Sequence, residues 1–307
     1  MKLDGIHHIT AITGDAARNV DFYTRVMGLR MVKKTVNQDD PTVYHLFYGD
    51  ENAHPGLDLT FFEYPGAGSG RAGAGMVHRI LWRVGSPAAL DFWAERLAGE
   101  EIEAERAGEA LRFRDPEGLE HELLLADVPD EPLIAEHPEV PAEHALQGFH
   151  GVRAFAADPE RSRRLLEQAL AFEARDDEGW EARGGSRGGT YVYDAPPAER
   201  GVQGAGTVHH VAWASSDEDH EAWGERVRAG GAHPTEVIDR HYFRSIYFRE
   251  PSGVLFELAT PSPGFTVDEP LETLGERLSI PPKLEPYRAE IEEALNPLPY
   301  RRATRQG

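Results

Sequence analysis

Near the start of the chain stands the stretch Gly5-Ile6-His7-His8-Ile9-Thr10, and its pattern recurs three times further along. Each copy is a short alternating segment with a histidine at its third place, which is typical of a half-buried β-strand. The other copies are Met76-Val77-His78-Arg79-Ile80-Leu81, Gly148-Phe149-His150-Gly151-Val152-Arg153 and Thr207-Val208-His209-His210-Val211-Ala212. Such repetition predicts a fold built from four similar units.

Each of these strands is followed by a segment that predicts an amphipathic helix. Apolar residues recur in it at helical spacing. A polar residue stands before each helix, where its side chain can accept a hydrogen bond from the first turn. These expected N-caps are Asp15, Ser86, Asp158 and Ser216. Short strand-like runs separated by Gly, Pro and Asp turns follow every helix, so the repeated unit is β-α-β-β-β.

The fold class that these units predict is α+β, with four βαβββ modules that form two half-open barrels. The modules are expected at 5–65, 75–128, 147–196 and 206–262. One module exposes an apolar sheet face, whereas two modules side by side can enclose a cavity.

The division of the chain follows from a change in composition between the second and third modules. The stretch 129–146 is rich in proline and glutamate and is predicted as a linker. It separates an N-terminal pair of modules (1–128) from a C-terminal pair (147–262). The remaining 263–307 is expected to be a tail with one short helix near 286–295.

The charge of the chain excludes several kinds of partner. The 307 residues include 32 Lys plus Arg and 53 Asp plus Glu, which gives a net charge of −21. Nucleic acids and anionic membrane surfaces bind clustered basic residues, so neither is an expected partner. The sequence contains no apolar run of bilayer length and no apolar signal region. We expect a cytoplasmic protein, and a homo-oligomer is compatible with the sequence.

The sequence contains no cysteine, and this narrows the chemistry of any metal site. Disulfides, iron–sulfur clusters, thiolate ligands and cysteine nucleophiles are all excluded. A metal could be held only by His, Asp, Glu or Tyr.

The place after the shared histidine distinguishes the four copies. A histidine that every copy carries at the third place is better explained as structural, or as a support for a neighbouring ligand. The fourth place holds His8, Arg79, Gly151 and His210 in chain order. Only the first and last modules can therefore offer an imidazole ligand there.

The closing strands of the modules differ in whether they carry an acid. Two of them can be aligned directly, as Asp115-Pro116-Glu117-Gly118-Leu119-Glu120-His121-Glu122 and Glu250-Pro251-Ser252-Gly253-Val254-Leu255-Phe256-Glu257. Glu122 and Glu257 are thus equivalent. Thr60 takes this place in the first module, and either Val192 or Tyr193 takes it in the third.

One complete ligand set results from this comparison. Two imidazoles and one carboxylate hold non-haem Fe(II) and leave coordination positions open. We predict such a metal at His8, His210 and Glu257, which requires the first and fourth modules to share a cavity. In the second module Arg79 would repel a cation and pair with Glu122, so the inner half of the chain is predicted to hold no metal.

Four stretches carry a resemblance that covers nearly the whole chain: Ile6–Thr10, Val36–Asp50, Gly206–Ala212 and Asp239–Glu257. They resemble the vicinal oxygen chelate superfamily, and more narrowly its ring-cleaving dioxygenases that act on hydroquinones, including chlorinated ones. The resemblance implies an Fe(II)-dependent, extradiol-type dioxygenase, with a small aromatic diol and dioxygen as its partners. Mn(II) suits the same ligands, and no organic cofactor site is expected.

The resemblance also implies which residues act beside the metal. Its ligands fall on the three residues already predicted, and its supporting residues fall on His7, His209, Arg240 and Tyr247. Either histidine could move protons, because imidazole titrates near neutrality. Arg240 could hold a substrate oxyanion and Tyr247 could hydrogen-bond it.

Simpler interpretations of these side chains stay open. Arg240 could instead form a surface ion pair with Asp239 or Glu236, and Tyr247 could lie in the apolar core. For the whole chain, two other functions compete. One is a glyoxalase-like metal-dependent isomerase or lyase, which would be expected to carry an acid where Thr60 stands. The other is a non-catalytic binding module, which usually lacks a complete ligand set.

Overall fold

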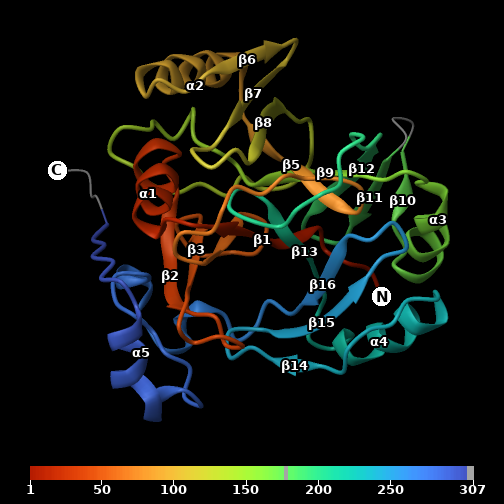
Figure 1. Cartoon of the computed structure of the whole chain (residues 1–307). Coiled ribbons are helices and arrows are strands. Elements are labelled where there is room, and N and C mark those ends of the chain that lie inside the picture. The colour runs from red at the N-terminus through yellow and green to blue at the C-terminus, as the bar shows by residue number, and fades with distance from the viewer. Residues whose placement is uncertain (176–178, 303–307) are drawn as a thin grey trace.

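The computed structural model describes residues 1–175 and 179–302 and shows two eight-stranded mixed sheets with few helices (Figure 1). This is the predicted α+β fold. In each module the first strand and the closing strand pair in parallel, which requires the crossover connection that the helix provides.

The first sheet combines the first and last modules. Its strands, in spatial order, are β14 (Ile238–Asp239), β15 (Arg244–Arg249), β16 (Leu255–Ala259), β13 (Val208–Ala214), β1 (Ile6–Thr13), β4 (Asp58–Glu63), β3 (Tyr44–Gly49) and β2 (Arg30–Val36). The antiparallel pairing of β1 with β13 joins the two modules. The two double histidines therefore lie on neighbouring strands, although about 200 residues separate them in sequence.

The second sheet combines the two inner modules. Its strands, in spatial order, are β10 (Glu173–Ala174), β11 (Gly179–Arg183), β12 (Gly188–Asp194), β9 (Phe149–Phe155), β5 (Met76–Val84), β8 (Glu120–Leu125), β7 (Ala110–Arg114) and β6 (Ala104–Ala107). Each sheet thus joins modules from opposite sides of 129–146. The division of the chain into two halves at this stretch stays a prediction.

The helices follow the first strands as expected, but two of them start later than predicted. They are α1 (Ala16–Val20) with the π-helix η1 (Asp21–Val26), α2 (Pro87–Gly99), α3 (Glu160–Arg163) with the π-helix η2 (Arg164–Ala169), and α4 (His220–Ala229). Asp15 and Ser86 cap their helices by accepting from backbone amides. The predictions of Asp158 and Ser216 as N-caps were wrong. Ser216 Oγ instead accepts from the amide of Asp219 in the turn before α4, 3.2 Å away, since short polar side chains also stabilise turns.

The apolar core is continuous between the two sheets. The largest fully buried side chains include Trp82 and Trp93 around the second sheet and Trp213 and Trp223 around the first. The Trp213 ring of β13 lies 6.1 Å from the ring of Tyr191 on β12, measured between centroids. Such edge-on contacts between aromatic rings add to the burial of apolar surface.

The tail covers the edge of the first sheet. It contains η3 (Phe265–Val267), η4 (Leu271–Thr273), η5 (Glu285–Tyr287) and α5 (Arg288–Ala294). Leu278 forms an isolated β-bridge with Lys34 on the edge strand β2. Lys34 Nζ also donates to the carbonyl of Leu298, 2.9 Å away. An exposed edge strand invites pairing with other chains, and the tail shields this one. Within 1–175 and 179–302, no helix has the length and apolar character needed to cross a membrane.

One buried histidine outside the candidate site predicts how stability depends on pH. His220 is fully buried at the start of α4, and its Nδ1 lies 2.7 Å from Ser215 Oγ. Its Nε2 has no hydrogen-bond partner among the described residues, so a second proton there would have no acceptor. Burial lowers the pKa of His220 to about 4. The unfolded chain therefore takes up this proton first, and stability falls as the pH drops from about 6.5 toward 4.

The variant His220→Asn tests this prediction, because asparagine can keep the bond to Ser215 and does not titrate. Urea unfolding at pH 6.5 and 4.5 should show a smaller loss of stability for the variant than for the wild type. The expected difference is about 2 kcal/mol, since one group contributes about 1.4 kcal/mol for each pH unit. Equal losses in the two proteins would refute the assignment.

Candidate metal centre

The pairing of β13 with β1 and β16 brings the three predicted ligands to one face of the first sheet. His8 lies opposite Ala212, and Ala212 lies opposite Glu257 in the next strand. His210 is two residues from Ala212 and so points to the same face. The small Ala212 side chain leaves space between the larger ones. This region faces the inside of the half-barrel, where a buried apolar cluster that includes Ala212, Phe47 and Phe243 lies.

The register also tests the alignment of the closing strands. In each module, the sixth residue of the repeated first-strand segment lies opposite the closing-strand position that holds Glu122 in the second module and Glu257 in the fourth. These pairs are Thr10 with Thr60, Leu81 with Glu122, Arg153 with Val192, and Ala212 with Glu257. The equivalence of Glu122 and Glu257 is confirmed, and Val192 rather than Tyr193 fills the place in the third module.

The three ligand atoms form a small triangle. His8 Nε2 lies 3.1 Å and His210 Nε2 lies 2.9 Å from Glu257 Oε2, and the two nitrogens are 3.4 Å apart. Two ligand atoms about 2.1 Å from one cation and at right angles to each other lie about 3.0 Å apart. The observed spacings fit this arrangement, in which all three ligands bind one face of the ion.

Glu257 is held so that one of its oxygens is left for a cation. Ser245 Oγ donates to Oε1 at 2.5 Å. Oε2 is buried and, among the described residues, accepts no hydrogen bond of normal geometry despite the two close nitrogens. Although burial opposes it, the neighbouring imidazoles lower the pKa of Glu257 well below its usual value. A buried carboxylate oxygen that accepts no hydrogen bond needs a positive partner, and a metal ion would supply one to Oε2.

His7 fixes which nitrogen of His8 faces Glu257. His7 Nε2 lies 3.1 Å from the carbonyl of Thr260 and must donate to it, because a carbonyl only accepts. Burial lowers the pKa of His7 to about 3, so the ring is neutral and its Nδ1 is an acceptor. That Nδ1 lies 2.9 Å from His8 Nδ1, which must then carry a proton. In a neutral His8 the lone pair is therefore on Nε2, which points toward the predicted metal.

The second histidine pair repeats this contact. His209 Nδ1 lies 2.8 Å from His210 Nδ1, and burial lowers the pKa of His209 to about 4. His209 and His210 both line a separate cavity of about 280 Å³. In both outer modules the shared histidine at the third place thus contacts the predicted ligand that follows it.

Asp58 lies close to His7 and His8 and forms a second group of potential ligands. That group offers no free lone pair on His7, since both of its nitrogens are engaged. Asp58 is buried, and burial raises its pKa to about 7. The group of His8, His210 and Glu257 is therefore the better candidate.

The cavity beside the predicted ligands is lined by aromatic rings and by polar side chains from the first and fourth modules. The aromatic lining includes Phe47, Phe62 and Phe243. The cavity has a volume of about 40 Å³, whereas a cavity of about 150 Å³ can hold benzene. An aromatic ring could enter only if part of the lining moved.

Two loops close this cavity. The Arg240 guanidinium makes two contacts of 3.0 Å with the Asp39 carboxylate. Gln38 Nε2 donates to the carbonyl of Arg240 at 2.6 Å. The segments that carry these residues connect strands and are not themselves part of β2, β3 or β15. They are the part of the lining that could move most easily.

The structure places Arg240 and Tyr247 in the cavity lining, whereas His7 and His209 lie behind the ligands. Arg240 pairs with Asp39 rather than with Asp239 or Glu236, the partners considered from sequence. Its Nε donates to Tyr247 Oη at 3.4 Å, and its guanidinium lies over the Tyr247 ring at 5.4 Å. Tyr247 is half-buried beside His210, with 5.8 Å between ring centroids.

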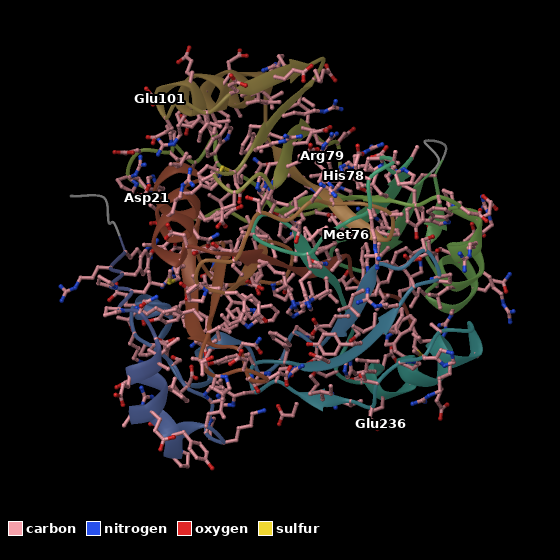
Figure 2. All side chains as sticks on the ribbon, viewed as in Figure 1. Asp21, Met76, His78, Arg79, Glu101 and Glu236 are labelled. Carbon is pink, nitrogen blue, oxygen red and sulfur yellow. The ribbon has the colours of Figure 1, made fainter. Side chains whose placement is uncertain are left out.

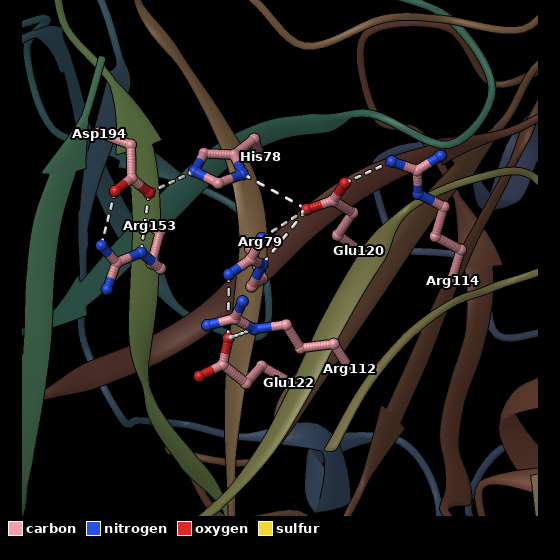
Figure 3. A network of polar contacts seen from close by, with 8 residues as sticks. All are labelled: His78, Arg79, Arg112, Arg114, Glu120, Glu122, Arg153 and Asp194. Carbon is pink, nitrogen blue, oxygen red and sulfur yellow. Dashed lines mark hydrogen bonds and ion pairs between the residues drawn. The ribbon is translucent and has the colours of Figure 1, made fainter. Parts of the chain in front are cut away.

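The equivalent region of the second sheet holds an arginine in place of a metal set (Figure 3). Arg79 Nη1 donates to Glu122 Oε2 at 2.9 Å, and Arg112 Nε donates to the same oxygen at 2.7 Å. Gly151 leaves no room for a second ligand, because a Cβ there would lie 2.0 Å from Thr190 Oγ1. The pairing of Arg79 with Glu122 was predicted from the repeat and is confirmed.

A much larger cavity lies elsewhere and does not contain the predicted ligands. It has a volume of about 1110 Å³, and its lining includes Asp21, Arg79 and Glu101 (Figure 2). Several of its charged side chains pair with one another, as Arg25 does with Asp21 and Glu100. Size alone therefore does not identify the functional site.

Sequence reasoning missed the contribution of the segment between β2 and β3. Gln38, Asp39, His45 and Phe47 from this region line the cavity. They belong to the stretch Val36–Asp50, which carried part of the family resemblance but was given no role. Thr10 was also missed; its Oγ1 lies 2.9 Å from His210 Nε2.

Comparison with known proteins gives a family match and close relatives. The family model described as "Glyoxalase/Bleomycin resistance protein/Dioxygenase superfamily" matches residues 5–130 and 148–258. The protein named "Putative ring-cleaving dioxygenase MhqO" of Bacillus subtilis (strain 168) is 42% identical over 308 residues, which is 98% of this chain and 98% of that protein. The "Chlorohydroquinone/hydroquinone 1,2-dioxygenase" of Sphingobium indicum is 34% identical over 315 residues, covering 96% and 97% of the two chains.

Solved structures show the same likeness. The crystal structure of a "putative dioxygenase" from Bacillus subtilis superposes with a TM-score of 0.90 at 40% identity, covering 98% of this chain and 99% of that one. Glyoxalase I from Zea mays superposes with a TM-score of 0.57 at 17% identity, covering 84% and 92%. The second likeness concerns the fold alone.

Proposed function

Because the chain belongs to the glyoxalase/bleomycin resistance protein/dioxygenase superfamily, also called the vicinal oxygen chelate superfamily, we propose that it is an Fe(II)-dependent ring-cleaving dioxygenase of the extradiol type. Its proposed substrates are dioxygen and a hydroquinone or related aromatic diol. The observation that carries the proposal is the triangle of His8, His210 and Glu257 inside a cavity lined by aromatic rings. The names of the relatives, which are ring-cleaving dioxygenases, point to the same chemistry.

The three residues would hold the metal, and the other side chains would position the reactants. A bound Fe(II) would lower the pKa of a coordinated hydroxyl and bind dioxygen. Mn(II) is the alternative ion for the same ligands. Ser245 and His7 keep Glu257 and His8 in the orientation that a metal requires.

Residues around the cavity are proposed to bind the substrate and to move its protons. Arg240 would stabilise an oxyanion on the ring, and Tyr247 would donate a hydrogen bond to it. Arg240 would first have to exchange part of its contact with Asp39 for the substrate. His7 and His209 touch the ligands rather than the cavity, so either would act on protons through the ligand beside it.

The competing functions are less well supported by the same site. A glyoxalase-like isomerase would be expected to carry an acid at the place of Thr60, but Thr60 Oγ1 is instead hydrogen-bonded to Thr10 Oγ1 at 2.8 Å. A binding module without catalysis would not need three converging ligands with fixed orientations.

Metal analysis combined with oxygen uptake tests the proposed function. The purified protein is loaded with Fe(II) without oxygen, and then mixed with hydroquinones or catechols in an oxygen electrode. We expect about one iron for each chain and uptake of one dioxygen for each diol consumed. Turnover of an unrelated substrate without oxygen uptake would favour an isomerase, and diol binding without turnover would favour a binding module. Parallel loading with Mn(II) decides between the two ions.

A further inference from the structure

His45 on β3 is a half-buried polar group in the candidate cavity that the proposed metal centre does not use. Its ring centroid lies 4.0 Å from that of Phe47 and 4.3 Å from that of Phe62. It lines the same cavity as His8, His210 and Glu257. His45 is opposite Phe62 of β4 in the sheet register, so its place is fixed by strand pairing and not by the loops that close the cavity.

A chain of hydrogen bonds determines which nitrogen of His45 carries its proton. Thr60 Oγ1 donates to Thr10 Oγ1 at 2.8 Å, and a hydroxyl has only one proton to donate. Thr60 must therefore accept from His45 Nε2, which lies 2.9 Å away. Burial, together with the nearby His8 and His210, lowers the pKa of His45 well below its usual value and keeps the ring neutral. Its Nδ1 is then left with a lone pair.

That lone pair is available to a ligand. None of the residues in 1–175 and 179–302 is hydrogen-bonded to His45 Nδ1. An aromatic diol that binds a metal through one oxygen and has its second hydroxyl across the ring must place that second O–H inside the cavity. A buried hydroxyl needs an acceptor. A neutral imidazole held on a strand of the cavity wall is suited to that role, whereas Gln38, another polar residue of the lining, lies in a loop.

We propose that His45 is a specificity-determining residue, whose Nδ1 accepts a hydrogen bond from the substrate hydroxyl that does not bind the metal. This inference rests on the proposed function and assigns a role that the metal ligands cannot fill. It predicts a preference for 1,4-diols over catechols, whose adjacent oxygens can both bind the metal. It also predicts that a 1,4-diol with a free far hydroxyl binds more tightly than a related compound in which that hydroxyl is blocked.

Binding without oxygen tests the inference separately from catalysis. The Fe(II)-loaded protein is titrated anaerobically with hydroquinone and with 4-methoxyphenol, in which the far hydroxyl is methylated. The wild type should bind hydroquinone about tenfold to a hundredfold more tightly than 4-methoxyphenol, because 4-methoxyphenol cannot donate the one buried hydrogen bond to His45. Equal affinities in the wild type, or no measurable binding of hydroquinone, would overturn the inference.

Two variants of His45 provide a matched pair. In His45→Asn the side-chain amide lies near the place of Nδ1, whereas in His45→Gln it lies near the place of Nε2 and can still reach Thr60. His45→Asn should keep most of the preference for hydroquinone, and His45→Gln should lose it through a higher KM with kcat less affected. Both should retain iron. Equal weakening of both ligands in His45→Gln would indicate a structural role and refute the proposal.

The outcomes separate this inference from the proposed function. If the wild type discriminates between the two ligands but consumes no oxygen, the dioxygenase proposal fails and the role of His45 stands. If the wild type consumes oxygen with hydroquinone and with 4-methoxyphenol at equal kcat/KM, the dioxygenase proposal stands and the role of His45 fails.

Discussion

Glu257→Gln is expected to lose iron almost completely while the protein stays folded. The substitution keeps the shape of the side chain and its contact with Ser245, but it removes the negative charge that faces His8 and His210. Changes to residues that only support a ligand already weaken metal affinity by about 10-fold to 100-fold, so loss of the charged ligand should exceed about 100-fold. Metal analysis after anaerobic loading and desalting measures this, and oxygen uptake should be lost with it.

His8→Ala and His210→Ala should give the same result, since each removes one of the two imidazoles. The control variants lie in the second sheet. Glu122→Gln changes the equivalent acid, and Arg79→Ala removes the guanidinium that pairs with it. Both should retain as much iron as the wild type. Iron loss in Glu122→Gln equal to that in Glu257→Gln would mean that the metal had been assigned to the wrong sheet.

Lys33→Met is expected to produce the largest loss of stability. Lys33 Nζ is fully buried on β2 and contacts Asp268 at 2.7 Å and also Glu269, a fully buried acid of the tail. It lies 5.0 Å from the centroid of the Tyr242 ring. Removing one partner of a buried ion pair costs about 3–5 kcal/mol, and the exposed Arg277, 3.5 Å from Glu269 Oε1, would compensate the remaining charge only in part. Urea unfolding at pH 7 should show a decrease of this size.

The double variant Lys33→Met/Glu269→Gln distinguishes this cause from a loss of packing. If the unpaired carboxylate is responsible, the second change should recover most of the lost stability. A double variant no more stable than Lys33→Met would show that the contacts of the lysine stem matter instead. Because Tyr242 Oη donates to Asp268 and its ring lines the cavity, substrate binding should weaken in Lys33→Met as well.

Internal repetition made much of the fold predictable. Four copies of one strand pattern set the module type, and the differences among His8, Arg79, Gly151 and His210 singled out the outer modules. The comparison worked because equivalent places in repeated units have similar surroundings, so a difference between copies marks a place where their local roles differ. The pairing of Arg79 with Glu122 followed from the alignment of the repeats and the opposite charges of the two residues.

Features that depend on contacts distant in sequence could not be predicted in the same way. The acid that pairs with Arg240 is Asp39, about 200 positions away, whereas the sequence offered only the neighbours Asp239 and Glu236. The wrong N-caps at Asp158 and Ser216 have a local cause, since a polar residue before a helix can stabilise either the helix or the preceding turn.

The sequence by itself determined the repeated module and the ligand types that remain when cysteine is absent, and it predicted His8, His210 and Glu257 as the ligand set. Only the tertiary structure decided that β1 and β13 pair in a register that places His8 and His210 two residues apart on one face, and that His45 lines the same cavity. The physical reason is that periodicity fixes which way a side chain points from its own strand, while strand register and burial decide what it meets.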